Sequence, residues 1–271
     1  MKAILMQRLT RRASALTMRN RFPHLVSSCA LAGVVLLATG CSTPGPTHAY
    51  LASRAEDPII DVLPGSPEVE IPSYLASVNE LYGIAYDPFT DHLFLRVFPG
   101  DFVRVIDRPA RKIKRGFIVK NLPLGRGDLA IRSSDRHLFF AHPTEGAVIE
   151  TNLNGVIVRT LALEHMQGPP AGVAYDQKNN LLFILKGGDL AHVGTYDLTG
   201  KRIAGVALDR NVRLTSLAYD SSAAEFYVPL ADEASIGIFH LNGHLLRTLP
   251  AADGAARDFV DVGQRSLLRL F

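Results

Sequence analysis

Charged side chains recur at loop positions in four similar segments of the chain, where they could together bind a polar ligand or a peptide. Each lies either just before the first apolar run of its segment or just after the second apolar run. The predicted ligand-binding residues are Glu80, Arg96, Asp128, His142, Lys186, Arg213, Asp232 and Asp258, with Asp101 and Asp189 in equivalent loops. Mixed charge suits recognition by hydrogen bonds and ion pairs, and it is equally typical of solvated loops. The pattern predicts binding and gives none of these residues a catalytic role.

Three further aspartates share one position and have a simpler interpretation. Asp87, Asp176 and Asp220 each directly follow an apolar run and precede a polar turn. A carboxylate there accepts hydrogen bonds from the backbone of its own turn. Because a structural need repeats in every segment, whereas a metal site usually forms once, we interpret these residues as turn formers.

Other sequence patterns give little support for catalysis. The chain contains no HExxH, no GxSxG and no Walker-type phosphate loop. His240 and His244 flank a turn but lack a third ligand, so they make a weak metal site. We therefore predict no metal and no cofactor, with a bound divalent cation as the alternative, and a non-enzymatic role is favoured.

The elements that position these residues follow from an internal repeat. Residues 83–87 recur in similar form at 128–132, 172–176 and 216–220, and the alanine shared by the four copies steps by 45, 44 and 44 residues. A fixed period of this size is typical of propellers and solenoids.

Each copy opens a series of short runs rich in Ile, Val, Leu, Phe and Tyr, which predict strands. In three copies the third and fourth runs are separated by Asn154-Gly155, Thr199-Gly200 or Asn242-Gly243, pairs that supply the positive φ of a tight hairpin. Four strands in about 44 residues predict one blade of a β-propeller. One blade cannot bury both of its faces, so the copies are expected to stack around an axis.

The two ends of the chain are predicted to share a fifth blade. Residues 258–262 and 267–270 resemble two strands of a new blade, and residues 59–62 and 69–71 supply its other two. Closure by both ends removes open sheet edges, which promote aggregation. The prediction is an all-β propeller of about five blades, with six blades, a β-sandwich and a β-solenoid as alternatives.

The repeat resembles those of the NHL, YVTN and regucalcin-like propeller families, whose blades open with a similar Gly-apolar-Ala-Tyr/Val-Asp segment. The resemblance covers roughly residues 58–271. It implies a ligand site at one mouth of the central channel. Regucalcin-like hydrolases hold a divalent cation with Glu, Asn and Asp from separate blades; Glu80 and Asp258 match part of that set, and no matching Asn is evident.

The first 40 residues have the pattern of an export signal. Basic residues precede an apolar run from 29 to 38 that is too short to span a bilayer. Residues 36–41 resemble the lipobox of bacterial lipoproteins, which implies acylation of Cys41; Ala38 departs from the usual Leu. Without this leader 23 basic and 26 acidic residues remain, a net charge of −3, which gives no case for nucleic acid binding.

These observations divide the chain into a signal peptide (1–40), a lipid-anchored linker (41–57) and a propeller (58–271). The favoured function is a lipid-anchored binding or scaffold module at the periplasmic face of the outer membrane, because Ser42 follows Cys41. Its partner would be a protein or an envelope component. The alternative is a metal-dependent hydrolase, lactonase or lyase at the channel mouth; a small-ligand sensor is a third hypothesis.

Overall fold

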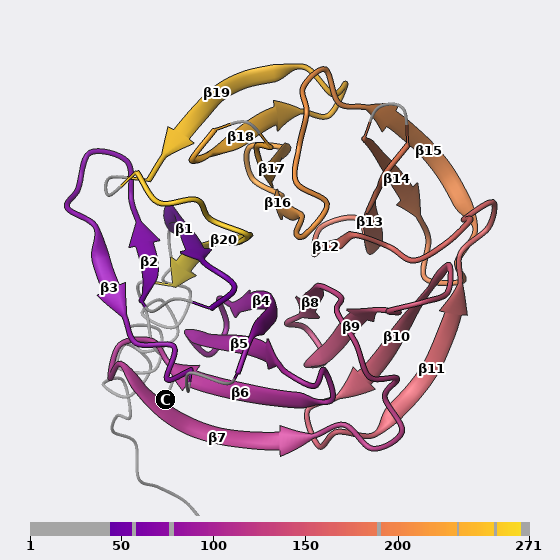
Figure 1. Cartoon of the computed structure of the whole chain (residues 1–271), viewed down its shortest axis with the longest axis horizontal. Coiled ribbons are helices and arrows are strands. Elements are labelled where there is room, and N and C mark those ends of the chain that lie inside the picture. The colour runs from indigo at the N-terminus through magenta and orange to yellow at the C-terminus, as the bar shows by residue number, and fades with distance from the viewer. Residues whose placement is uncertain are drawn as a thin grey trace, which may run out of the picture. The chain divides into compact units, whose positions relative to one another are not determined.

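The computed structural model describes residues 44–55, 58–75, 79–188, 191–231, 233–251 and 254–266. These residues form five four-stranded antiparallel sheets arranged as blades in a ring (Figure 1). The described residues contain no helix, and hence no helix that could cross a membrane. The predicted β-propeller is confirmed, with five blades.

Every blade is built from an innermost strand at the axis to an outermost strand at the rim. The first blade comprises β4 (Leu81–Asp87), β5 (His92–Val97), β6 (Phe102–Asp107) and β7 (Lys112–Ile118). The second comprises β8 (Leu129–Arg132), β9 (His137–Ala141), β10 (Ala147–Asn152) and β11 (Ile157–Ala162). The third comprises β12 (Gly172–Asp176), β13 (Leu181–Lys186), β14 (His192–Tyr196) and β15 (Arg202–Ala207). The fourth comprises β16 (Ala218–Asp220), β17 (Glu225–Pro229), β18 (Ser235–His240) and β19 (Leu245–Pro250).

The fifth blade joins the two ends of the chain and corrects the predicted closure. Its order from axis to rim is β20 (Phe259–Ser266), β1 (Pro44–Ala52), β2 (Ile59–Val62) and β3 (Val69–Ile71). The second strand is therefore β1, which the sequence analysis assigned to a linker, and not residues 267–270, which lie outside the described residues. Asp61 of β2 fixes this closure, since it hydrogen-bonds His48 of β1 at 2.7 Å and pairs with Arg265 of β20.

The prolines of β1 explain why that strand was missed. Pro44 and Pro46 lack an N–H and suggest a linker, yet they lie beyond the pairing with β2, which begins at Ala49. Along this stretch β1 pairs only with β20, and the register shifts between Pro44 and Thr47. Proline is tolerated where one side of a strand is open.

Apolar side chains fill the spaces between neighbouring blades. The innermost strands β4, β8 and β12 are buried at every residue, whereas the outermost β7 is almost entirely exposed. Between the second and third blades, for example, Phe139 stacks on Tyr175 with ring centroids 5.4 Å apart. Burial of one such side chain stabilises the fold by about 2 kcal/mol.

Close approach near the axis explains the small residues of the repeat. A Cβ added to Gly83 would lie 2.9 Å from the Cα of Asp128 in the next blade, and one added to Gly172 would lie 2.7 Å from the backbone nitrogen of Leu217. A side chain at either glycine would therefore clash with the next blade.

The predicted turn chemistry is confirmed. Asp87, Asp176 and Asp220 accept backbone N–H groups two residues later at 3.1, 2.9 and 2.8 Å. Gly155, Gly200 and Gly243 have φ of 74°, 88° and 85°, as tight hairpins require.

Candidate functional site

Two cavities open at opposite ends of the ring axis. At one end, which we call the turn mouth, the inner strands run into turns such as Pro88-Phe89 and Ser221-Ser222. At the other end, which we call the entry mouth, the chain enters the inner strands near Gly127 and Thr215. The repeat predicts a site at the entry mouth. The larger cavity, of about 440 Å³, lies at the turn mouth.

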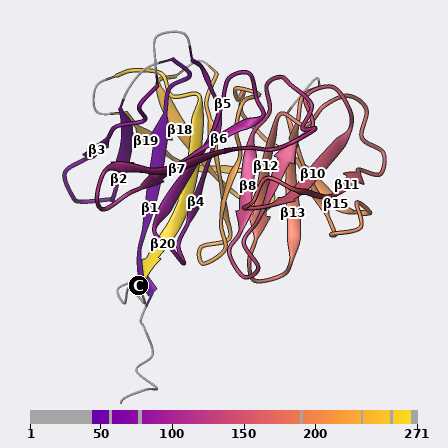
Figure 2. The same cartoon turned by 90° about the horizontal axis from the view of Figure 1, so that it is seen from below.

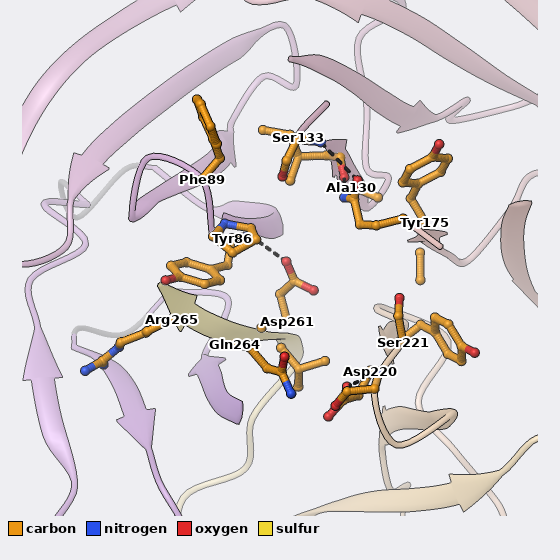
Figure 3. A pocket seen from close by; sticks show the side chains of 18 residues that line it. Tyr86, Phe89, Ala130, Ser133, Tyr175, Asp220, Ser221, Asp261, Gln264 and Arg265 are labelled. Carbon is orange, nitrogen blue, oxygen red and sulfur yellow. Dashed lines mark hydrogen bonds between the residues drawn. The ribbon is translucent and has the colours of Figure 1, made fainter. Parts of the chain in front are cut away.

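The turn-mouth cavity is lined by all five blades (Figure 3). Each inner strand contributes a lining residue: Tyr86, Ala130, Tyr175, Tyr219 and Asp261. The turns add Phe89, Ser133, Gln177 and Ser221. Most of the lining is apolar. A volume in this range accommodates a small organic ligand.

Asp261 is the ionisable group nearest the centre of this cavity (Figure 3). Its Oδ2 accepts the backbone N–H of Tyr86, on the neighbouring blade, at 2.5 Å. The carboxyl group lies deep in the molecule, while part of the residue remains accessible from the cavity. Burial raises the pKa of Asp261 to about 7, although hydrogen bonds from the backbone of Tyr86 and Val262 act in the opposite direction.

The other charged residues of the lining are already neutralised or bonded. Asp220 accepts N–H and hydroxyl groups of its own turn. Arg265 pairs with Asp61 and donates to the Tyr50 hydroxyl at 3.3 Å. Within the described part of the chain, no ion pair involves Asp261.

A second buried carboxylate lies at the start of the second blade's inner strand. Asp128 is fully buried, and its Oδ2 accepts the N–H groups of Val173 at 3.3 Å and Leu217 at 3.0 Å. It thus ties the second blade to the third and fourth. Burial raises the pKa of Asp128 well above its usual range, and the charge of Asp261 adds to this effect. We assign Asp128 a structural role.

The entry mouth holds a cavity of about 360 Å³, and its lining differs from the prediction in an instructive way. Five lining residues are direct neighbours of predicted ones in the chain. Gly127 precedes Asp128, and Pro143, Gly187, Leu214 and Phe259 follow His142, Lys186, Arg213 and Asp258. The repeat located the correct loops. Side-chain direction changes from one residue to the next, so the predicted residues themselves do not line this cavity.

Besides Asp128, two further predicted residues are buried, which corrects their proposed place at the mouth. Arg96 is fully buried and donates to the carbonyl oxygens of Gly100, Gly127 and Ala141 at 2.8, 2.9 and 3.0 Å. His142 is buried, and its Nδ1 accepts the N–H of Glu145 at 3.0 Å. Both stabilise loops.

The remaining predicted residues lie nearer the surface. Glu80 pairs with Arg126 at 3.3 Å, and Asp258 pairs with Arg213 at 3.5 Å. Lys186 is partly exposed at the end of β13. Asp232, like Asp189 and the proposed acylation site Cys41, lies outside the described residues.

One group of potential metal ligands occurs among the described residues. Asp135, His137 and Glu150 place ligand atoms within 4.8 Å of one another. Arg132 lies 2.6 Å from Asp135 and 2.5 Å from Glu150, and Arg159 lies 2.6 Å from Glu150. Because two arginines already compensate the carboxylates, we interpret this group as an ion-pair network.

A signal for Asp261 was present in the repeat. It stands in the fifth blade 43 residues after Ala218, in line with Ala85, Ala130, Ala174 and Ala218. Four blades carry a methyl group at this position near the axis, and the fifth carries a carboxylate. The replacement of the repeated alanine by an aspartate in the fifth blade was therefore a signal in the sequence for a site at Asp261.

No protein-family model matches the chain, and no curated protein matches its sequence. A chain of the nidogen/laminin complex is similar in structure, with a TM-score of 0.57 and 10% identity over 80% of this chain and 98% of that chain. A protein of unknown function from Bacteroides caccae matches with a TM-score of 0.47 and 14% identity over 77% and 74% of the two chains. Kuenenia stuttgartiensis hydrazine synthase gives 0.44 and 11% over 69% and 52%.

These likenesses extend to the fold alone. The nidogen/laminin match agrees with a β-propeller. Membership of the NHL, YVTN or regucalcin-like families stays a prediction.

Proposed function

We propose that this protein is a lipid-anchored envelope lipoprotein whose propeller binds a small ligand at the turn mouth. The observation that carries the binding role is the turn-mouth cavity itself, which all five blades line. Of its two carboxylates, Asp220 accepts hydrogen bonds from its own turn, whereas Asp261 has neither such a turn nor an ion-pair partner among the described residues. Because a fold of this kind serves many functions, the function is inferred from the residues of the site and not from the fold. The structural neighbour from the nidogen/laminin complex, a propeller-like chain within a protein assembly, is consistent with binding.

The place of β1 supports an orientation for the anchored protein. Pro44, the first residue of β1, pairs with Ser266 at the end of β20, next to the cavity-lining residues Gln264 and Arg265. Figure 2 shows β1 and β20 running past the ends of the neighbouring strands at this end of the ring. Three residues of chain reach at most about 11 Å. A lipid on Cys41 would therefore hold the turn mouth close to the membrane surface.

The hydrolase alternative finds little support in the geometry. Glu80 and Asp258, its proposed cation ligands, each pair with an arginine, and neither belongs to a group of three potential ligands in the described part of the chain. A carboxylate that is compensated by an arginine is a poor starting point for a cation site.

Acylation is tested by expressing the full chain with an alkyne-labelled palmitate in a bacterial host. We expect the label on the wild-type protein and on Cys29→Ser, the matched control, because Cys29 lies in the discarded signal. Cys41→Ser is expected to carry no label and to leave the outer-membrane fraction. Label retained on Cys41→Ser would refute the anchor.

A further inference from the structure

The chemistry of the turn-mouth cavity indicates what it can bind. Three charged residues line it, and two have partners: Asp220 bonds its own turn, and Arg265 pairs with Asp61. The third, Asp261, has one oxygen held by the N–H of Tyr86. Its carboxyl group is drawn in Figure 3 with the other oxygen turned toward the open centre of the cavity. A buried carboxylate is costly unless a positive charge or more hydrogen bonds compensate it.

The walls around Asp261 are suited to a hydrocarbon body. Ala130, Ala174 and Val262 surround it, and Pro88 and Phe89 lie at the rim. Phe89 is 67% exposed. A ligand that covered Phe89 would gain apolar burial, and a cation near its ring face would gain a cation–π contact.

We propose that the turn-mouth cavity binds a primary ammonium group carried on an apolar body, with Asp261 as its counter-ion. This rests on the proposed function that the turn mouth is the ligand site. The ammonium group donates up to three hydrogen bonds and brings the positive charge that the carboxylate lacks. An anionic ligand would be repelled by Asp261, and a neutral alcohol would leave the negative charge uncompensated.

Protonation of Asp261 gives the proposal a second measurable property. Because burial raises the pKa of Asp261 to about 7, a fraction of the empty sites is protonated at neutral pH, and an ammonium ligand favours the ionised form. Binding should release a proton, and affinity for an amine should rise about tenfold from pH 6 to pH 8. The other charged groups near this end of the inner strands or coupled to Asp261 are Asp87, Asp128, Arg132, Asp176, Asp220 and Arg265.

The experiment compares two probes of nearly the same shape. Benzylamine and benzyl alcohol are titrated calorimetrically into the mature protein, held in phosphatidylcholine vesicles, in two buffers with different ionisation enthalpies. We expect benzylamine to bind at least about tenfold more tightly, since a charge-assisted contact contributes about 1.5 kcal/mol or more. Benzylamine should also release a proton, and benzyl alcohol should release none.

Variants of the two aspartates separate charge from structure. Asp261→Asn should bind both probes equally and lose the pH dependence. Asp176→Asn is the matched control, because it removes one carboxylate at the same end of the ring without lining the cavity, and asparagine can still bond the turn backbone. It should bind as wild type. Near-ultraviolet circular dichroism of each variant verifies the fold.

The outcomes distinguish the proposal from the function on which it rests. Equal binding of both probes to the wild type, or a benzylamine preference that survives in Asp261→Asn, overturns the ammonium site and leaves the binding role intact. If neither benzylamine nor benzyl alcohol binds, both the ammonium site and the ligand-binding role are overturned. The titrations need the vesicles only to be present in the sample, so a protein that is not acylated is mixed with them and a failed anchor leaves the test valid.

A second arm identifies the source of the ammonium group. The benzylamine titration is repeated in vesicles that contain phosphatidylethanolamine or its N-acetylated form. Competition by the amine lipid alone supports a membrane headgroup as the ligand. Equal benzylamine affinity in both vesicles supports a free amine.

Discussion

The two mouths of the propeller carry charge in different ways. At the entry mouth charged residues are numerous, but Arg96 and His142 are buried in loops and Glu80 and Asp258 are paired with arginines. At the turn mouth Asp220, Asp261 and Arg265 line the cavity, and Asp261 has no ion-pair partner in the described chain. The proposed ligand site therefore rests on a charge that the protein leaves without an ion pair. The number of charged loop residues is a poorer guide.

The largest loss of stability is expected when the buried side chain of Arg96, near the entry mouth, is removed. Arg96→Ala leaves three carbonyl oxygens without a donor and opens a space beside Phe140, so we expect a loss of about 4 kcal/mol in the free energy of unfolding. Urea unfolding measures it. Arg96→Lys keeps the positive charge but not the several N–H donors of the guanidinium group, so its free energy of unfolding should lie between those of the wild type and Arg96→Ala. A loss below about 1 kcal/mol would contradict the structural role.

A comparable effect should appear at the turn mouth as a dependence on pH. The pKa of Asp261 is about 7 in the folded protein and about 3.9 when unfolded, so between these values the native state holds a proton that the unfolded state releases. Stability relative to Asp261→Asn is therefore greatest below about pH 4, falls as pH rises, and levels off above about pH 7, by up to about 4 kcal/mol in all. Urea unfolding at several pH values measures it, and parallel profiles for the two proteins would disprove it.

The second buried carboxylate should matter for packing between blades. Asp128→Ala leaves the N–H groups of Val173 and Leu217 without an acceptor, and we expect a loss of about 3 kcal/mol. Asp128→Asn retains an acceptor oxygen and should cost about 1 kcal/mol. Hydrogen exchange at the two amides is the direct measurement. If both variants lost the same stability, the amide contacts would not be its source.

The smallest effect is expected at the surface of the entry mouth. Arg126 and Glu80 are 64% and 39% exposed and lie 3.3 Å apart. Arg126→Ala should change the free energy of unfolding by no more than about 0.5 kcal/mol, because solvent and salt screen such pairs. It should also leave benzylamine affinity unchanged, since it lies at the opposite mouth. Reduced affinity in this variant would weaken the contrast between the two mouths.

The sequence by itself determined the blades and their turns. The period of about 44 residues, the hairpin glycines and the aspartates that bond their own turns are local patterns, and each has its predicted place in the structure. Local patterns are reliable because backbone preference and hydrophobic alternation act within a few residues.

Only the tertiary structure decided how the ring closes and where its cavity lies. Tyr86 and Asp261 meet across 175 residues of chain, and β1 enters the fifth blade through its pairing with β20. Neither contact follows from local preference, because it depends on the axis that brings all five inner strands together. For the same reason, loops could be assigned to a mouth from the repeat, while the side chains that face the cavity could not.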